Sequence, residues 1–410
     1  MYKAQTLIVG GGVWGLSTAY HLARSGRTNV LVLERNEELF DETTSQAAGL
    51  VGQVRTTSVM RRAIRYAVDL FSNFERETGH DPGFRQVGSL LLALTPERMA
   101  SYEEQVAHAN NNAVEASFVD DAELSRLAPG LDVSRVEGGY FVPGDGYLDP
   151  RQCARALGAA AKDGRVRIRT GTRVTGLSVR DNRVVGVETE GGLVEAEQVV
   201  VTAGPWTGVV ARTAGYEPAM QPIRHQRVTT VPVEGIPAHH PVVRVTDVGC
   251  YLRPEKGGYL YGFFEPHPTS YDLEALPPEF KTADIEAPVE VMAEARDRLD
   301  PIFPGLKGLE VAEYKRGLTT FAPDGAYLVG PVPGIEGLFA ATGCASLGIA
   351  GSAAVGRWLA NWVTEGDPGE DLTPVDLERF GEKAADREWV RRESEKFYGA
   401  YYSIPSMSVT

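Results

Sequence analysis

The amino-acid sequence predicts an α/β fold, in which strands alternate with helices, and three stretches carry this prediction. In Thr6–Ala23 an apolar run is followed by a group of glycines and a helix-like run. Arg173–Trp206 is typical of three short strands joined by turns, the last of them apolar. Gly337–Val363 again gives a strand, a glycine turn and a helix. We expect all three stretches to contribute to one sheet.

The first stretch has the spacing of a dinucleotide-binding turn. Gly10, Gly12 and Gly15 form a G-x-G-x-x-G pattern between the β-like run and the helix-like run. In such a turn the first glycine permits a tight bend, the second admits a pyrophosphate against bare backbone, and the third lets helix and strand pack closely. A second strand ends at Glu34, where a carboxylate can accept hydrogen bonds from a ribose diol. A turn without a ligand is the alternative for the glycines alone, but strand, helix and acid together favour a dinucleotide.

FAD fits the rest of the chain better than NAD. The segments Arg173–Trp206 and Gly337–Val363 both return to the expected sheet, and the second offers a further helix N-terminus to the same site. A flavin is long, and placing it requires contacts from segments that are far apart in sequence. We therefore expect FAD as the cofactor.

Composition excludes several classes of protein. The chain has 410 residues, 43% of them hydrophobic, which suits a globular protein with a large core and two domains. Its formal net charge of -14 argues against a nucleic-acid or anionic-membrane binder, and no stretch approaches the ~20 apolar residues of a membrane helix. Three cysteines without C-x-x-C spacing favour the cytoplasm. His239-His240 lacks partnering cysteines or spaced carboxylates, so we expect no metal site.

Eight stretches that run nearly from end to end carry a resemblance to a known family. They are TSQAAGLVGQVR (Thr44–Arg55), DPGFRQVGSLLLALTPER (Asp81–Arg98), DGYLDP (Asp145–Pro150), TAGPW (Thr202–Trp206), RHQRVTT (Arg224–Thr230), YLRPEKGGYLYGFFEP (Tyr251–Pro266), FAPDGAYLVGPVPG (Phe321–Gly334) and GCASLGIAGSAAVGRWLANW (Gly343–Trp362). With these motifs the chain resembles the FAD-dependent amine oxidoreductases of the D-amino-acid oxidase superfamily. It is most similar to the flavin portion of dimethylglycine and sarcosine dehydrogenases.

The resemblance implies a two-domain α/β flavoprotein, with a discontinuous Rossmann-like FAD-binding domain and an antiparallel-sheet substrate domain. The FAD-binding domain is expected to take residues 1–85, 146–222 and 313–380. The substrate domain is expected to take residues 86–145 and 223–312. Residues 381–410 are expected to form a charged C-terminal tail with a helix on the surface.

Two departures from the family pattern change what we expect. Many relatives attach the flavin covalently through a histidine where this chain has Gln46, and another branch uses a cysteine where our alignment places Gly317. FAD should therefore be bound noncovalently. Many relatives also continue into a folate-binding domain, whereas this sequence stops at Thr410 and resembles the oxidising half alone.

The reaction implied by the resemblance is oxidation of the C–N bond of an N-methylated or cyclic, secondary or tertiary amino acid, such as dimethylglycine or sarcosine. Hydride passes to flavin N5, and water hydrolyses the resulting imine. The alternatives are a D- or primary amino-acid oxidase or dehydrogenase of the same fold, and a flavin subunit of a larger complex. The electron acceptor, O2 or an electron-transfer protein, stays open.

The amine must first lose its proton, because an ammonium has no lone pair with which to expel the hydride. His225 is the first candidate acceptor, since imidazole titrates near neutral pH; a purely structural histidine is the alternative. In dimethylglycine oxidases the histidine of a His-Gln pair acts with a tyrosine of a Tyr-x-Arg segment, and the matching residue here is Tyr251. Tyr259 competes with Tyr251 on the same hairpin. A substrate carboxylate would need a guanidinium, and the unranked candidates are Arg55, Arg227, Arg253 and Arg316.

The expected cofactor-binding residues come from segments spread along the chain. They are Gly10, Gly12, Val13, Trp14, Gly15, Glu34, Arg35, Thr44, Ser45, Gln46, Ala48, Gly49, Leu50, Val174, Ala203, Gly204, Trp206, Gly343, Ser346, Leu347, Gly348 and Ile349. The loop Gly343–Ile349 is expected to point backbone N–H groups at the flavin, where they would stabilise negative charge on the reduced ring.

Overall fold

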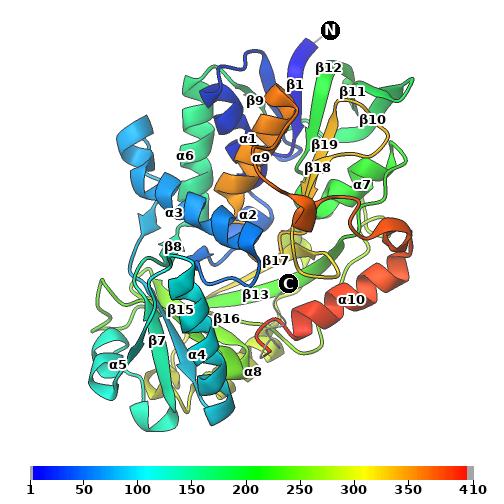
Figure 1. Cartoon of the computed structure of the whole chain (residues 1–410). Coiled ribbons are helices and arrows are strands. Elements are labelled where there is room, and N and C mark those ends of the chain that lie inside the picture. The colour runs from blue at the N-terminus through cyan, green and yellow to red at the C-terminus, as the bar shows by residue number, and fades with distance from the viewer. Residues whose placement is uncertain (1–2, 404–410) are drawn as a thin grey trace.

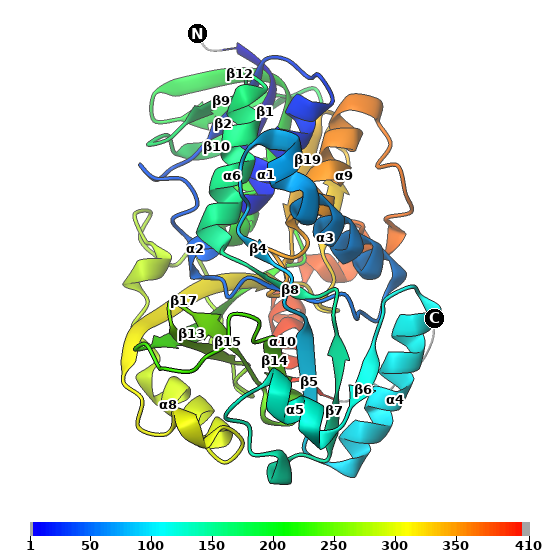
Figure 2. The same ribbon diagram turned by 90° about the vertical axis from the view of Figure 1, so that its left-hand side faces the viewer.

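Two eight-stranded sheets and one three-stranded sheet organise residues 3–403, the part of the chain that this computed structural model describes. In Figure 1 the first large sheet lies in the upper half of the molecule and the second in the lower half. Figure 2 shows the small sheet at the level where the two halves meet.

The first sheet is built around parallel strands. Its strands are β1 (Lys3–Val9), β2 (Val30–Leu33), β9 (Arg167–Arg169), β10 (Val174–Arg180), β11 (Arg183–Thr189), β12 (Gly192–Val201), β18 (Leu328–Pro331) and β19 (Leu338–Thr342). The order is β10-β11-β12-β1-β2-β9, and β19 pairs with β12 and β18. Because β1 is parallel to β2 and β12, and β12 to β19, the carboxyl ends of these strands lie along one edge.

Helices cover this sheet on both faces. They are α1 (Val13–Arg24), α3 (Ser58–Thr78), α6 (Pro150–Asp163) and α9 (Ser352–Glu365) on one face and α7 (Thr207–Arg212) on the other. Strand alternation supplies both packing surfaces: Ile8 and Val32 point to the first group of helices, and Leu7 and Leu31 to the opposite face. The α/β prediction is thus confirmed, including the meander over Arg173–Trp206, which forms β10 to β12.

The second sheet is almost entirely antiparallel. Its strands are β5 (Ser89–Ala93), β6 (Ser117–Val119), β7 (Gly138–Val142), β13 (Gln221–Thr230), β14 (Val242–Val245), β15 (Cys250–Glu255), β16 (Gly258–Phe263) and β17 (Val311–Phe321). The order is β17-β13-β16-β15-β14-β5-β7-β6, with β5 and β14 as the parallel pair. α5 (Asp121–Leu127) and α8 (Val289–Leu299) pack against one face, and α4 (Pro96–Asn111) lies against β5 and β7. α4 covers β5 and β7 on the face opposite to α5 and α8, and Arg244 of β14 and Tyr251 of β15 line the cavity on that same face.

The strands do not follow the expected domain boundaries in every place. β17 pairs with β13 along most of its length, so residues 313–321 belong to the second sheet, whereas the sequence prediction assigned them to the FAD-binding domain. Strand pairing over long sequence separations decides this, and no local pattern reports it. The division into domains stays a prediction.

A small sheet and a short helix connect the two halves. The small sheet consists of β3 (Leu50–Val51), β4 (Phe84–Arg85) and β8 (Gly146–Leu148), and the helix α2 (Thr43–Gln46) precedes it. The segment from α2 to β3 therefore leads from a helix in contact with β17 to the small sheet.

The C-terminal segment is less exposed than expected. It forms α10 (Arg387–Gly399), which begins where the Asp386 side chain accepts a hydrogen bond from Trp389 N–H. The outer face of α10 is charged, as predicted, but Ser394 and Tyr398 are fully buried. Ser394 Oγ donates to the Phe321 carbonyl at 3.1 Å, so α10 is fastened to β17; Figure 1 shows it, in red, beside the junction of the two halves. Residues 404–410 of the predicted tail lie outside the described residues.

Within residues 3–403 there is no helix with the length and apolarity needed to cross a bilayer. The same residues hold no group of three or more histidine, cysteine or acidic side chains suited to a metal ion.

Candidate active site

A cavity of about 680 Å³ lies between the carboxyl edge of the first sheet and one face of the second. Val9, Leu33 and Thr342, the last residues of β1, β2 and β19, line one part of it, and His225 and Tyr251 line another. Ligands of open α/β sheets bind at the carboxyl ends of the strands. The cavity is therefore the candidate active site.

The glycine turn fits a diphosphate. A Cβ at Gly15 would lie 2.0 Å from the Gly10 carbonyl oxygen, so Gly15 permits close packing of α1 on β1. Gly10 has a φ of 110°, which side-chain-bearing residues rarely adopt. Gly12 lines the cavity, and a Cβ at this position would lie 3.3 Å from the Thr44 hydroxyl oxygen. Bare backbone at the start of α1 thus faces the cavity, as a pyrophosphate group requires.

The acid expected to hold a ribose is in place and anchored. One Glu34 carboxylate oxygen accepts from Gly11 N–H at 2.7 Å and the other from Asn36 N–H at 2.9 Å. Burial raises the pKa of Glu34. These two bonds fix the carboxylate on the cavity wall and leave lone pairs for hydroxyl donors, since each oxygen carries two.

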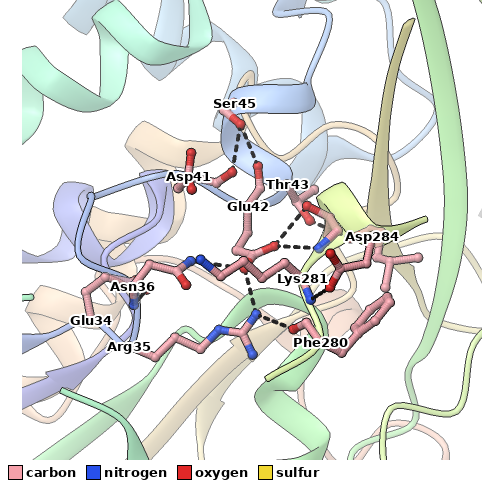
Figure 3. A network of polar contacts seen from close by, with 12 residues as sticks. Glu34, Arg35, Asn36, Asp41, Glu42, Thr43, Ser45, Phe280, Lys281 and Asp284 are labelled. Carbon is pink, nitrogen blue, oxygen red and sulfur yellow. Dashed lines mark hydrogen bonds and ion pairs between the residues drawn. The ribbon is translucent and has the colours of Figure 1, made fainter. Parts of the chain in front are cut away.

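A network of polar contacts around Glu42 holds the wall next to this acid (Figure 3). Glu42 accepts from Arg35 at 2.6 Å, and from the Thr282 backbone N–H at 2.9 Å and hydroxyl at 2.8 Å. Burial raises the pKa of Glu42, but hydrogen bonds from Asn36 and Thr282 outweigh burial and hold this pKa below its usual value. Arg35 also donates to the Phe280 carbonyl and its guanidinium lies 3.6 Å from the centre of the Trp206 ring. Residues 280–282 are thereby tied to the cofactor side of the cavity.

The loop before α9 offers only part of the donors that the sequence predicts. The N–H groups of Cys344 and Ser346 donate to the hydroxyls of Thr320 and Thr319, and Ala345 and Leu347 also have backbone acceptors. Among the described residues the N–H groups of Gly348 and Ile349 have no such acceptor, and both residues line the cavity. These two groups, close to the start of α9, are the ones available to a ligand.

The register of the second sheet positions two of the predicted catalytic residues. Tyr251 on β15 stands opposite Gly262 on β16, and a Cβ at Gly262 would lie 2.1 Å from the Tyr251 hydroxyl. The glycine therefore leaves room for the tyrosine ring to lie over β16 and reach β13. There the Tyr251 hydroxyl is 2.9 Å from His225 Nε2. The two residues that the sequence motif paired are brought together.

His225 is enclosed and carries no charge near neutral pH. Burial, followed by the nearby Arg227 guanidinium, lowers the pKa of His225 to about 3. Burial raises the pKa of Tyr251 as well. The Nδ1 atom of His225 is 2.8 Å from the hydroxyl of Tyr398 on α10. The neutral imidazole is thus held between two protonated tyrosines, and only Tyr251 of the two lines the cavity.

Tyr259 lies elsewhere. Side chains alternate along β16, so Tyr259 points to the face opposite that of Gly262. It packs in the core beneath the sheet, with its ring 5.7 Å from that of His240. It does not line the cavity, so the structure gives it no place beside His225.

Of the four predicted arginines, the structure places only Arg55 on the cavity. Arg227 donates to the Gln46 carbonyl at 2.9 Å and Arg253 to the Ala48 carbonyl at 2.9 Å, so both hold the segment after α2 against the second sheet. Arg316 donates to the carbonyls of Ala283 and Ile285. These three guanidiniums have structural partners because their strand positions point them at main-chain oxygens, which a motif does not reveal.

Arg244 is a functional candidate that sequence reasoning missed. It lies on β14 directly opposite Tyr251 and lines the cavity with 7% of its surface exposed. A Cβ at Gly52 would lie 2.6 Å from its guanidinium, so the chain leaves room for it there. The sequence did contain a signal for Arg244. It is a single charged residue between Val243 and Val245, two apolar strand residues that pack in the core.

Two tyrosines that follow α10 line the cavity, which the sequence did not indicate. Tyr401 and Tyr402 line it, and the Tyr401 ring stacks on Phe264 with 4.0 Å between ring centres. A cluster of tyrosines within a few residues of the chain end was the only signal in the sequence.

Most predicted cofactor residues share this one cavity. Those that line it are Gly10, Gly12, Val13, Trp14, Glu34, Arg35, Thr44, Gln46, Ala48, Gly49, Leu50, Val174, Ala203, Gly204, Trp206, Ser346, Leu347, Gly348 and Ile349. The predicted residues that do not line the cavity are Gly15, Ser45 and Gly343, which belong to the elements that support its wall. For example, Ser45 Oγ donates to the carbonyls of Asp41 and Glu42 at the start of α2.

Comparison with known proteins shows the family. A family model described as FAD dependent oxidoreductase matches residues 5–362. The chain belongs to this family. It is 31% identical over 405 residues to the mitochondrial dimethylglycine dehydrogenase of Rattus norvegicus, covering 97% of this chain and 47% of that protein. It is also 31% identical to the 4-methylaminobutanoate oxidase (formaldehyde-forming) of Paenarthrobacter nicotinovorans, covering 98% of this chain and 48% of that protein.

This chain spans about half the length of the curated relatives it matches. Among solved structures, L-proline dehydrogenase from P.horikoshii matches with a TM-score of 0.83 at 24% identity, covering 92% of this chain and 98% of that one. The predicted resemblance and the predicted fold are both confirmed.

Proposed function

We propose that this chain uses noncovalently bound FAD to oxidise the C–N bond of an N-methylated or cyclic, secondary or tertiary amino acid. One observation carries the proposal: a single cavity joins the diphosphate-type turn at Gly12 to the Tyr251–His225 pair and to the guanidiniums of Arg55 and Arg244. The relatives named for dimethylglycine and 4-methylaminobutanoate support an N-methylated substrate. FAD, when bound, supplies the acceptor for the hydride.

Arg244 and Arg55 are the groups that would hold the substrate carboxylate. The acid nearest to the Arg244 guanidinium is Asp145 at 3.9 Å, beyond hydrogen-bond distance. Asp145 accepts from Gln53 N–H instead, and burial raises its pKa. The Nε atom of Arg55 is buried without a partner among the described residues. Two guanidiniums that line one cavity attract an anion, and a guanidinium can bind a carboxylate bidentately.

Tyr251 and His225 are the groups that would handle the amine. The imidazole of His225 is neutral near neutral pH and has a lone pair for a proton, but the burial that lowers its pKa to about 3 also makes it a weaker base than a free imidazole. Both residues line the cavity, and the Tyr251 hydroxyl is 2.9 Å from His225 Nε2. In the proposed reaction the proton of the substrate ammonium passes to the Tyr251 oxygen, and the hydroxyl proton of Tyr251 passes on to His225.

Noncovalent binding is supported at the two positions where relatives attach flavin. A Cβ at Gly317 would lie 3.0 Å from the Gln46 Cβ, so both positions share one wall of the cavity. Neither glutamine nor glycine offers a nucleophile for a stable bond to the ring. Cofactor released by acid or heat, rather than retained on the denatured chain, would support this.

The experiment is a screen of N-methylated, cyclic, D- and primary amino acids for anaerobic bleaching of the FAD absorbance. We expect bleaching by N-methylated or cyclic substrates, with formaldehyde released from N-methyl ones. Ammonia and an α-keto acid from primary or D-amino acids would favour the alternative reaction. Purified, folded protein that stays colourless with excess FAD would contradict the proposal.

The same samples, opened to air, identify the electron acceptor. Rapid reoxidation with formation of peroxide indicates O2, and slow reoxidation that an electron-transfer protein accelerates indicates a dehydrogenase. Size-exclusion chromatography of the active sample tests whether the chain works alone or as a subunit. The cytoplasmic location stays a prediction from the cysteine pattern.

A further inference from the structure

Tyr398 touches the candidate proton acceptor from behind. Its hydroxyl is 2.8 Å from His225 Nδ1, on the opposite side of the ring from Tyr251. The Tyr398 ring is fully buried among Phe264 and Phe321, with ring centres 5.2 Å and 5.4 Å away. Tyr398 does not line the cavity, so it cannot touch a ligand there.

The two hydrogen bonds of His225 cannot have arbitrary directions. A neutral imidazole carries one N–H, so one ring nitrogen donates and the other accepts. With the proton on Nδ1, the ring donates to the Tyr398 oxygen, and Nε2 accepts from the Tyr251 hydroxyl. The Tyr251 oxygen then turns its lone pairs to the cavity. With the proton on Nε2, Tyr251 instead turns its O–H to the cavity and cannot take a proton.

We infer that Tyr398 is a positioning residue that holds the His225 proton on Nδ1, so that Tyr251 faces the substrate as a proton acceptor. The inference rests on the proposed function. As the ammonium N–H bond breaks, its proton goes to the Tyr251 oxygen, and the Tyr251 proton goes to His225 Nε2. The resulting imidazolium donates from Nδ1 to the Tyr398 oxygen. The amine keeps the electron pair, and no oxidant or reductant takes part in this step.

The charged groups around Tyr251, His225 and Tyr398 are compatible with proton transfer from Tyr251 to His225 Nε2. Arg227 lies near His225 and Tyr251, while Arg253 lies near Tyr251. On the side of α10, burial and then the Glu265 carboxylate keep the pKa of Tyr398 well above its usual value, so its hydroxyl stays protonated. Glu265 itself is paired with Arg224 at 2.9 Å. The Tyr398 hydroxyl thus meets His225 Nδ1 as a neutral group, which can accept the ring N–H.

The first test reads the tautomer directly. Protein with 15N-labelled histidine rings, compared with His225→Gln for assignment, shows which His225 nitrogen carries the proton. We expect Nδ1–H in the original chain and a shift towards Nε2–H in Tyr398→Phe, which keeps the buried ring. This readout needs no substrate, so it is independent of whether the proposed reaction is correct. A proton found on Nε2 in the original chain overturns the inference.

The second test uses the rate of anaerobic flavin reduction by the best substrate, from about pH 6 to about pH 10. Tyr398→Phe should slow it by about 10- to 100-fold at the acid end. The loss should shrink as pH rises, because an amine that arrives neutral needs no acceptor. A loss that is equal at every pH indicates a merely structural role and overturns the inference, as does no loss at all.

The matched control is Ser394→Ala on the same helix. It removes the hydrogen bond from Ser394 to the Phe321 carbonyl, one turn before Tyr398, without touching His225. If Tyr398 only docks α10, both variants should change the pH profile alike. We expect the profile of Ser394→Ala to keep its original shape.

Discussion

Arg244 reaches the cavity because strand residues alternate between two faces. Val243 and Val245 pack in the core of the second sheet, so the residue between them points to the opposite face. Its guanidinium finds room beside Gly52, and its ion pair with Asp145 is long at 3.9 Å. Arg227 donates to the Gln46 carbonyl, and Arg253 donates to the Ala48 carbonyl and to Glu255. Residue type alone does not show which of these arginines can bind a substrate carboxylate, whereas their hydrogen-bond partners in the structure do.

At this scale we predict that Arg244→Gln weakens substrate binding more than it slows flavin reduction. Losing a charged hydrogen bond to a carboxylate costs about 1.5 to 3 kcal/mol, or about 10- to 100-fold in the substrate concentration for half-maximal reduction. Rapid-mixing measurements of flavin reduction against substrate concentration give both parameters. Arg316→Gln is the control, because its partners are carbonyls of Ala283 and Ile285 outside the cavity. Equal effects of the two variants would contradict the assignment.

The contrast between Tyr251 and Tyr259 shows how far sequence reasoning reaches. Local spacing was enough for the glycine turn and for Glu34, since both lie within one strand-helix-strand unit, β1-α1-β2. The His225–Tyr251 pair needed a family motif, because the strands that bring it together are not adjacent in the sheet. Tyr398 could not be found at all: no local pattern says which strand face a C-terminal helix will cover.

At the scale of elements, α1 is the helix on which the cofactor side depends, and its two neighbours approach it differently. α9 crosses α1 at Gly356, where a Cβ would lie 2.2 Å from Ser17 Oγ and 2.6 Å from the Ser17 backbone carbon. α6 passes α1 at Gly158, where a Cβ would meet only the Leu16 side chain at 3.5 Å. The close contact between α9 and α1 therefore requires glycine at Gly356, whereas the spacing between α6 and α1 leaves room for a methyl group at Gly158.

These two positions make a matched pair of stability predictions. Gly356→Ala should destabilise the protein by about 1 to 3 kcal/mol, because the added methyl group forces α9 away from α1. Gly158→Ala should stabilise it by about 0.5 to 1 kcal/mol, because alanine restricts the unfolded chain and fits the helix without strain. Urea unfolding followed by circular dichroism measures both. Destabilisation by both variants would mean that α6 packs on α1 as tightly as α9 does.

At the scale of the whole molecule, the cavity belongs to neither sheet alone. One end of it is built by strand ends of the first sheet, another wall by the face of the second, and a further part by Tyr401 and Tyr402 after α10. The tie of Glu42 to Thr282 and that of Arg227 to Gln46 hold these parts together. Burial of polar groups at this junction, and under α1, makes the folded state sensitive to acid.

Two buried histidines, His225 and His21, determine that the protein loses stability as pH falls. Burial lowers the pKa of His225 to about 3 and that of His21 to about 4, against an ordinary value of 6.5. Below pH 6.5 the unfolded chain binds protons that the folded chain does not, so stability is full above about pH 6.5 and falls as pH drops towards these values. Each group should remove about 2 kcal/mol between pH 6.5 and pH 5.

His21 allows this to be tested away from the active site, because it bonds the Ser17 carbonyl and the Tyr66 hydroxyl beneath α1. In His21→Gln the side chain no longer titrates, so the free energy of unfolding should fall by about 2 kcal/mol less than in the original chain when pH drops from 8 to 5. Urea unfolding at pH 8 and pH 5 measures this difference for both chains, and the values at pH 8 report separately what the lost hydrogen bonds cost. An unchanged pH dependence would mean that His21 is protonated in the folded protein at pH 5, with water reaching the space under α1.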